Sequence, residues 1–135
     1  MKKGFGPHLT LDLSKCKPKT LDNYDFIFKI LDELPEKIGM TKITKPYVFP
    51  YAGLVPEDKG ITGVVIIAES HISIHTFQEK DYVFIDIFSC KAFDVDFAAN
   101  YLIKAFGAKK VEKNVLYRGR DFPISKIYQV TTRKE

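Results

Sequence analysis

Three consecutive strand-like segments between residues 61 and 90 constrain the fold more than any other feature of the sequence. Residues 61–68 contain the uninterrupted apolar run VVII, which is typical of a strand buried on both faces. Residues 71–77 (HISIHTF) and 82–90 (YVFIDIFSC) alternate apolar and polar side chains, as half-buried strands do. We therefore predict an antiparallel sheet at the centre of the chain.

Two segments with helical spacing flank these strands. From Thr20 onward, apolar residues recur every three or four positions as far as Leu34, and Thr20 is a candidate N-cap. We expect this helix to be perturbed or to end near Pro35. A second helix is expected over residues 94–106, with Gly107 as its C-cap.

Further strands are expected at residues 8–16, 41–48 and 109–120, and a turn-rich loop at residues 49–60. Together these elements predict an α+β fold with helices on one face of a mostly antiparallel sheet. The other sheet face also carries apolar side chains, and a second copy of the chain is the simplest cover. We therefore expect a homodimer, which would form an αββα sandwich.

Composition places the chain among ordinary globular domains. With 45% hydrophobic and 28% charged residues, we expect a single domain over residues 1–135. The sequence has neither a membrane-length apolar run nor a signal peptide, so we expect a cytoplasmic protein without a membrane partner. Its positive charges are scattered among apolar residues, which argues against nucleic-acid binding. No spacing of Cys or His predicts a metal site.

The turn QEKD at residues 78–81 fixes the register of the strands that it joins. Antiparallel partners should add up to about 159 in residue number. This register places Ser70 opposite Ser89, and Glu69 opposite Cys90. A Glu-Ser bond and a later cysteine are therefore expected to be neighbours in space.

Two histidines follow Ser70 on the same predicted strand. His75 lies five residues further on, which is about 16 Å along an extended strand, so its imidazole cannot reach Ser70 unless the strand bends sharply. We expect His75 to serve a partner subunit, in a homodimer with two shared sites. His71 is expected to be structural.

Residues 68–76 (AESHISIHT) and 86–90 (DIFSC) closely resemble the prokaryotic S-adenosylmethionine decarboxylases. The resemblance extends more loosely from GPHL near the start, through TGVVII, to the second helix. It implies a self-cleaving, pyruvoyl-dependent carboxy-lyase. Such an enzyme makes decarboxylated S-adenosylmethionine, the aminopropyl donor of spermidine synthesis.

The resemblance also implies how the cofactor would form. In this family the serine hydroxyl attacks the carbonyl of the preceding glutamate, and the resulting ester breaks by β-elimination to dehydroalanine, which loses ammonia to become pyruvoyl. These roles would fall to Ser70 and Glu69. The products would be a β chain of residues 1–69 and an α chain of residues 70–135.

Three more residues receive roles from the resemblance. His75 would accept a proton in the elimination, and the hydroxyl of Thr62, where the family usually has serine, would assist the first step. The pyruvoyl group would bind the substrate amine as a Schiff base and act as an electron sink. Cys90 would then donate a proton to the resulting carbanion.

Substrate-binding residues follow from the same comparison, because this chain reads HTFQE where the family commonly reads HTWPE. Phe77 retains an aromatic face that can stack on adenine or attract a sulfonium. Phe49 or Tyr47 could supply the second face. Glu79 or Asp86 could hold a substrate amine or sulfonium by charge.

Some features depart from the family, and they leave alternatives open. The loop at residues 53–60 is longer than usual, and Lys91 replaces a common glycine. The chain could instead be a pyruvoyl-dependent arginine or ornithine decarboxylase of the same lineage, or a non-cleaving relative that binds a nucleoside or regulates an active paralogue. Among the remaining aromatic residues, Phe84, Phe88 and Phe93 are expected in the core.

Overall fold

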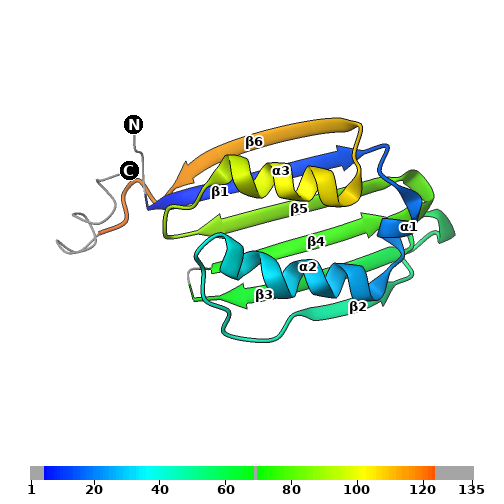
Figure 1. The fold of residues 1–135 in the computed structure, drawn as a ribbon, viewed down its shortest axis with the longest axis horizontal. Coiled ribbons are helices and arrows are strands. Elements are labelled where there is room, and N and C mark those ends of the chain that lie inside the picture. Colours follow the sequence, from blue (N-terminus) through cyan, green and yellow to red (C-terminus); the bar gives the residue numbers. More distant parts are fainter. Residues whose placement is uncertain (1–4, 69, 124–135) are drawn as a thin grey trace.

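The computed structural model describes residues 5–68 and 70–123. Figure 1 shows one antiparallel sheet in the strand order β2-β3-β4-β5-β1-β6, with two helices across it. The strands are β1 (Gly6–Ser14), β2 (Tyr47–Tyr51), β3 (Gly60–Ile67), β4 (Ser70–Phe77), β5 (Tyr82–Ser89) and β6 (Lys110–Arg118); the α-helices are α1 (Pro18–Leu21), α2 (Tyr24–Lys37) and α3 (Val95–Phe106); the 3₁₀ turns are η1 (Pro56–Asp58) and η2 (Gln78–Lys80). The predicted α+β class is confirmed.

Helix α2 begins later than predicted. Its N-cap is Asn23, whose side chain accepts a hydrogen bond from the backbone N–H of Phe26 at 3.0 Å. The prediction of Thr20 was wrong, because Thr20 belongs to the separate short helix α1 and its hydroxyl donates to the carbonyl of Lys17. Pro35 lies in the last turn of α2, where it lacks the N–H that would bond to the carbonyl four residues earlier, and the helix ends two residues later at Lys37, near the predicted position.

Helix α3 lies where it was predicted and has the predicted C-cap, Gly107, while its N-cap, Asp94, was not identified from the sequence. Asp94 caps the N-terminus by accepting from Phe97 N–H, and Gly107 ends the helix in the left-handed conformation, with φ of 62°. Neither α3 nor any other helix in the described part of the chain has the length and apolar character needed to cross a membrane.

The edge strand β2 was misplaced by the sequence analysis. The strand expected at residues 41–48 forms only at its end, where Tyr47 and Val48 begin β2, while Lys42 makes an isolated bridge with Ile67. Strand β2 then continues to Tyr51, inside the segment expected to be a loop. Pro50 accounts for the error, since proline is excluded from central strands but tolerated on an edge. The long β2–β3 connection is therefore shorter than the sequence suggested.

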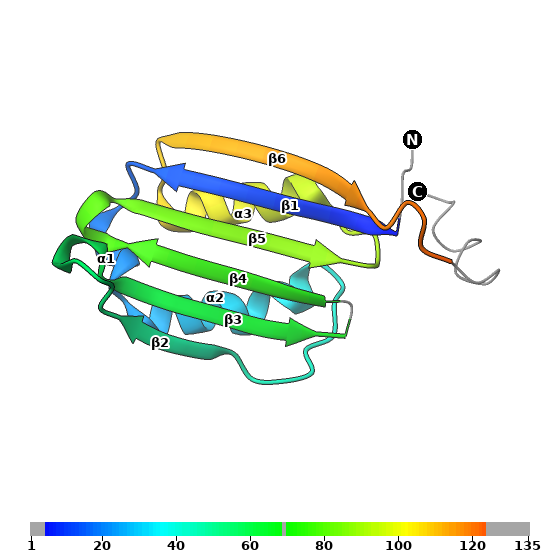
Figure 2. The same ribbon diagram turned by 180° about the vertical axis from the view of Figure 1, so that it is seen from behind.

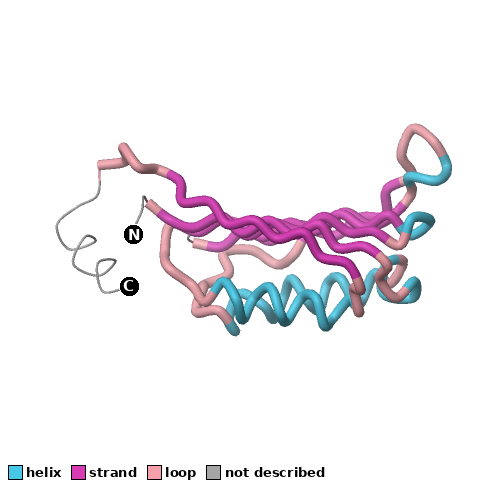
Figure 3. Tube along the Cα trace, turned by 90° about the horizontal axis from the view of Figure 1, so that it is seen from above, coloured by secondary structure: helices cyan, strands magenta, loops and turns pink. Residues whose placement is uncertain are grey.

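The two faces of the sheet differ. One face packs on α2 and α3 (Figure 3), and the core there is aliphatic: Leu9, Leu11, Leu13, Val65, Ile72, Ile74, Val83, Ile85 and Ile87 are buried. The other face, which Figure 2 shows from behind, is covered by no helix among the described residues. We call it the open face.

Two aromatic residues expected in the core lie on this open face instead. Phe84 is 42% exposed, and Phe88 lies under the guanidinium of Arg118. The reason is the two-residue period of β5, because Val83, Ile85 and Ile87 take the buried positions and leave the even-numbered positions outside. Phe93 packs against the core, as expected.

Candidate active site

Ser70 is the first residue of β4, and it pairs with Ser89 of β5, as the hairpin register predicted. On its other side it pairs with Ile67 of β3. Its φ is 155°, a region that residues with a Cβ rarely adopt, so the backbone is held in a strained conformation at this position. Glu69, the residue before it, lies outside the described residues.

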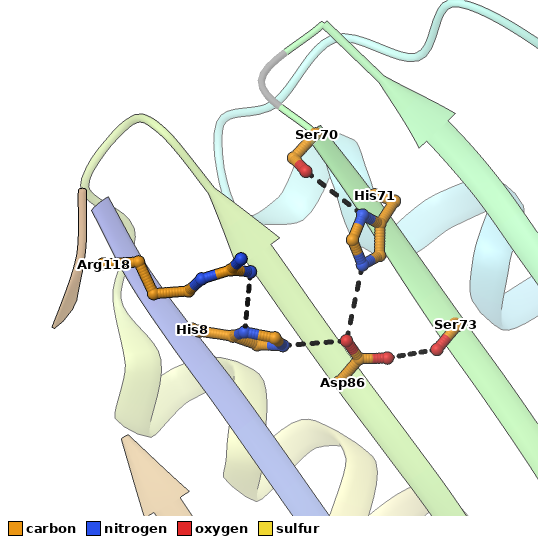
Figure 4. A network of polar contacts seen from close by, with 6 residues as sticks. All are labelled: His8, Ser70, His71, Ser73, Asp86 and Arg118. Carbon is orange, nitrogen blue, oxygen red and sulfur yellow. Dashed lines mark hydrogen bonds and ion pairs between the residues drawn. The ribbon is translucent and has the colours of Figure 1, made fainter. Parts of the chain in front are cut away.

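The hydroxyl of Ser70 contacts a histidine, although not the one that the sequence analysis singled out (Figure 4). Ser70 Oγ lies 3.1 Å from Nδ1 of His71, and Nε2 of the same ring lies 3.4 Å from Asp86 Oδ2. His71 was expected to be structural, and its contact with Ser70 was missed. The signal was its adjacency to Ser70 and its place opposite Phe88, two residues from Asp86 on the next strand.

Asp86 is the centre of the polar network in Figure 4. Besides His71, it accepts hydrogen bonds from Nε2 of His8 at 2.8 Å and from the hydroxyl of Ser73. Burial raises the pKa of Asp86, but the hydrogen bonds from Ser73 and His8 and the charges of the two imidazoles outweigh it, so the net pKa lies below its ordinary value. The carboxylate is therefore ionised at neutral pH.

Arg118 completes the network from the edge strand β6. Its guanidinium lies 4.3 Å from the centroid of the Phe88 ring and donates to Nδ1 of His8 at 3.3 Å. A guanidinium has no acceptor, so His8 Nδ1 must accept, and the ring proton of His8 sits on Nε2, where it can be donated to Asp86. Neither His8 nor Arg118 was identified from the sequence.

Cys90 directly follows Ser89, the cross-strand partner of Ser70, and is partly buried. Gly6 packs tightly against the backbone there: a Cβ on Gly6 would lie 1.8 Å from the Ser89 carbonyl oxygen and 2.8 Å from the Cys90 Cα. Cys16, in contrast, is buried in the core, and burial together with the charge of Asp81 raises its pKa to about 11. Cys16 therefore packs in the core, as expected.

His75 and Thr62 lie at the other end of the same strands. They are cross-strand partners on β4 and β3, and His75 Nδ1 is 3.4 Å from Thr62 Oγ1. Both line an open pocket of about 660 Å³, whose full lining is Phe49, Pro50, Tyr51, Thr62, His75, Thr76, Phe77 and Phe84. The pocket lining therefore combines aromatic rings with one imidazole and the hydroxyl-bearing side chains of Tyr51, Thr62 and Thr76.

Of the predicted substrate-binding residues, some line this pocket and others do not. Phe77 and Phe49 line it, and Phe77 meets Phe84 edge to face with ring centroids 5.7 Å apart. Tyr47 is half exposed and pairs with Val64, outside the pocket lining. Glu79 lies in η2 near Lys59, with 3.7 Å between the charged atoms, and is also outside the lining.

Within one chain these two groups of residues do not meet. Strand β4 pairs without interruption with both neighbours from Ser70 to His75. Five residues of extended strand span about 16 Å. Ser70 with its network therefore occupies one end of β4, and His75 with the aromatic pocket occupies the other.

Comparison with known proteins gives one family. The family model described as S-adenosylmethionine decarboxylase matches residues 7–119. S-adenosylmethionine decarboxylase proenzymes from Thermococcus gammatolerans and from Clostridium botulinum strain Loch Maree are 35% and 36% identical over 117 and 116 residues; each alignment covers 85% of this chain, and 77% and 95% of the relative.

A solved structure agrees with this result. The crystal structure of the adenosylmethionine decarboxylase from Aquifex aeolicus matches with a TM-score of 0.74 and 28% identity, over 93% of this chain and 97% of that one. The sequence and the fold thus point to the same conclusion. The chain belongs to the S-adenosylmethionine decarboxylase family.

Proposed function

We propose that this chain is a self-cleaving S-adenosylmethionine decarboxylase that acts in spermidine synthesis. It cuts its own backbone between Glu69 and Ser70 and converts Ser70 into a pyruvoyl group at the start of an α chain of residues 70–135. The observation that carries this proposal is the place of Ser70: it begins a strand, its hydroxyl contacts an imidazole, and it pairs with the residue before Cys90.

The residues around Ser70 fit a pyruvoyl group. Ser70 begins its strand, so a chain end there would leave the pairing of β4 with β3 and β5 in place. Once formed, the group supplies a carbonyl that binds the substrate amine and withdraws the electrons released with carbon dioxide. Cys90 donates the proton that replaces the lost carboxylate.

The aromatic pocket supports S-adenosylmethionine as the substrate. Phe49, Phe77 and Phe84 offer ring faces for an adenine base and for a positively charged sulfonium. Arginine and ornithine have no aromatic base to place there. We expect S-adenosylmethionine to be decarboxylated in preference to both amino acids when the three compete in one assay.

The site becomes complete in a homodimer. Side chains on the open face, among them Phe84 and Ile66, remain exposed in a single chain. Suppose that the open faces of two copies pack together, related by a two-fold axis that passes between the sheets at the midpoint of β4. The two β4 strands then run in opposite directions, and the His75 end of one copy lies over the Ser70 end of the other. Across the interface, Thr62 would then assist the first step, and His75 would accept the proton of the elimination.

Mixing two inactive variants tests this shared site. Chains carrying Ser70→Ala lack the serine, and chains carrying His75→Ala lack the proton acceptor. In a mixed dimer, one site has both residues, so His75→Ala chains should be processed only after mixing. If mixing leaves both variants uncut while wild-type chains are cut, the shared site is wrong.

Intact mass measurement tests the self-cleavage. We expect purified protein to separate into residues 1–69 and 70–135, the latter beginning with pyruvoyl, and Ser70→Ala to remain in one piece. Borohydride, which reduces the pyruvoyl carbonyl, should abolish the release of carbon dioxide from carboxyl-labelled S-adenosylmethionine. A wild-type chain that stays uncut under all conditions would instead indicate a non-cleaving binding or regulatory relative.

A further inference from the structure

Ser70, His71 and Asp86 form a continuous chain of hydrogen-bonding groups (Figure 4). The Ser70 hydroxyl lies 3.1 Å from one ring nitrogen of His71, and the other ring nitrogen lies 3.4 Å from the Asp86 carboxylate. A serine, a histidine and an aspartate in this order form the arrangement that activates a hydroxyl for attack on a carbonyl. In this chain the carbonyl in question is that of the residue directly before Ser70.

The Asp86 carboxylate determines which nitrogen of His71 can act. An ionised carboxylate only accepts hydrogen bonds, so Nε2 of His71 must carry the proton that points toward Asp86. In the neutral ring, Nδ1 then has a lone pair, and it faces Ser70 Oγ. His71 is therefore held in the form that can accept a proton from Ser70.

The rest of the network fixes Asp86 itself. Ser73 donates to Oδ1, and His8 donates to Oδ2 at 2.8 Å, so the carboxylate is held by three side chains from two neighbouring strands. Because Arg118 donates to Nδ1 of His8, the ring is oriented with Nε2 as the nitrogen that donates to Asp86. The network is thus arranged to orient His71.

We propose that His71 is the base that removes the Ser70 Oγ proton in the first step of self-cleavage, and that Asp86 is its positioning residue. This inference rests on the proposed self-cleavage. In that step Ser70 Oγ bonds to the carbonyl carbon of residue 69 while its proton passes to His71 Nδ1. The bond from that carbon to the Ser70 nitrogen then breaks, and the nitrogen receives the proton from His71. The peptide becomes an ester, and no other reactant is consumed.

This role separates the two histidines of β4. His75 lies about 16 Å from Ser70 along the strand, so of these two histidines it is His71 that contacts the hydroxyl within one chain. The φ of 155° at Ser70 assists the same step, because backbone strain in the precursor is released when the peptide bond breaks. His71 thus acts on the attack, and His75 on the later elimination.

The test uses hydroxylamine, which cleaves an ester but not a peptide bond. In His75→Ala, the first step should proceed and the second should stall, so hydroxylamine should cut the chain and leave an α chain that begins with intact serine. In His71→Ala, the ester should form about 10²–10⁴-fold more slowly, which is the usual contribution of a general base. His71→Ala should therefore remain uncut with or without hydroxylamine.

Asp86→Asn gives a second, independent measurement in which His71 is retained. We expect it to slow ester formation, and the double variant with His71→Ala to be no slower than His71→Ala alone, because both changes remove one function. Losses that multiply in the double variant would indicate a merely structural Asp86 and would contradict the positioning role. This comparison remains valid if one variant is less stable, because it is made between rates of folded chains.

The outcomes separate this inference from the proposed function. Wild-type protein that never cleaves would overturn both. Wild-type cleavage with unchanged ester formation in His71→Ala would overturn the role of His71 alone. Loss of the ester in His71→Ala, with its accumulation in His75→Ala, would support the division of the two steps.

Discussion

Replacing Gly6 with alanine should damage the site without touching any reacting group. The added Cβ would lie 1.8 Å from the carbonyl oxygen of Ser89 and 2.8 Å from Cys90 Cα, whereas real Cβ contacts are essentially never under 3.0 Å. Both atoms belong to the backbone, so no side chain can rotate away. Strand β1 and the end of β5 must separate by about 1 Å, and Cys90 must move with them.

The size of the effect follows from that displacement. A shift of about 1 Å in a reacting group can cost about 10²-fold in rate. Overpacking at such a position costs about 1–3 kcal/mol of folding free energy. We therefore expect Gly6→Ala to lower the melting temperature and to reduce carbon dioxide release per processed chain about 10²-fold.

Gly39→Ala is the matched control. Its Cβ would meet nothing within 4 Å, but its φ of +79° makes alanine strained there, at a cost of about 1–2 kcal/mol. It should lower the melting temperature and leave turnover per processed chain unchanged. The reasoning about Gly6 is refuted if Gly6→Ala matches the wild type in both stability and turnover, or if Gly39→Ala loses as much turnover.

Three further outcomes are expected. The pKa of Asp86 is lowered from 3.8, so the ionised carboxylate stabilises the fold fully above about pH 4, and this contribution is lost as pH falls through the folded-state pKa. Thermal melting measured from pH 7 to 2 should show this loss of stability, and Asp86→Asn should remove this part of the pH dependence. Phe77→Leu should raise the KM for S-adenosylmethionine about 3–10-fold by removing a ring face, whereas Phe97→Leu, on helix α3, should not. Thr76→Val should cost about 2–4 kcal/mol in urea unfolding, because it leaves the buried N–H of Ile61 and carbonyl of Leu21 without their partner; unchanged stability would contradict this.

The register of the central strands could be predicted from the sequence alone. Alternation fixes the buried face, and a slip of one residue would have reversed every side chain on β4 and β5. The pairing of Ser70 with Ser89 therefore followed from the turn and from the pattern HISIHTF. The prediction of edge strand β2 failed because Pro50 is a residue that argues against a strand in a sequence pattern. An edge strand is paired on one side only and can therefore contain a proline.

The polar network could be only partly predicted. The register implied that His71 and Asp86 lie on neighbouring strands, but it gave no sign of His8. His8 reaches Asp86 only because β1 inserts between β5 and β6, and that long-range order is not encoded in any local pattern. The same insertion brings Arg118 to His8. Without those partners, a lone histidine after a serine is most simply interpreted as structural.

The residues at the two ends of β4 explain why a dimer would be needed for the proposed chemistry. His75, which would accept the proton of the elimination, and Thr62, which would assist the first step, line the same pocket as the aromatic residues that would hold the substrate. A second copy placed over Ser70 would therefore bring the proton acceptor and the substrate pocket together. Within one chain His71 already contacts the Ser70 hydroxyl, but the reactive carbonyl would form only where a second copy supplies His75 for the elimination. Since an exposed pyruvoyl carbonyl would react with any free amine, this coupling would confine the cofactor to sites that are ready to use it.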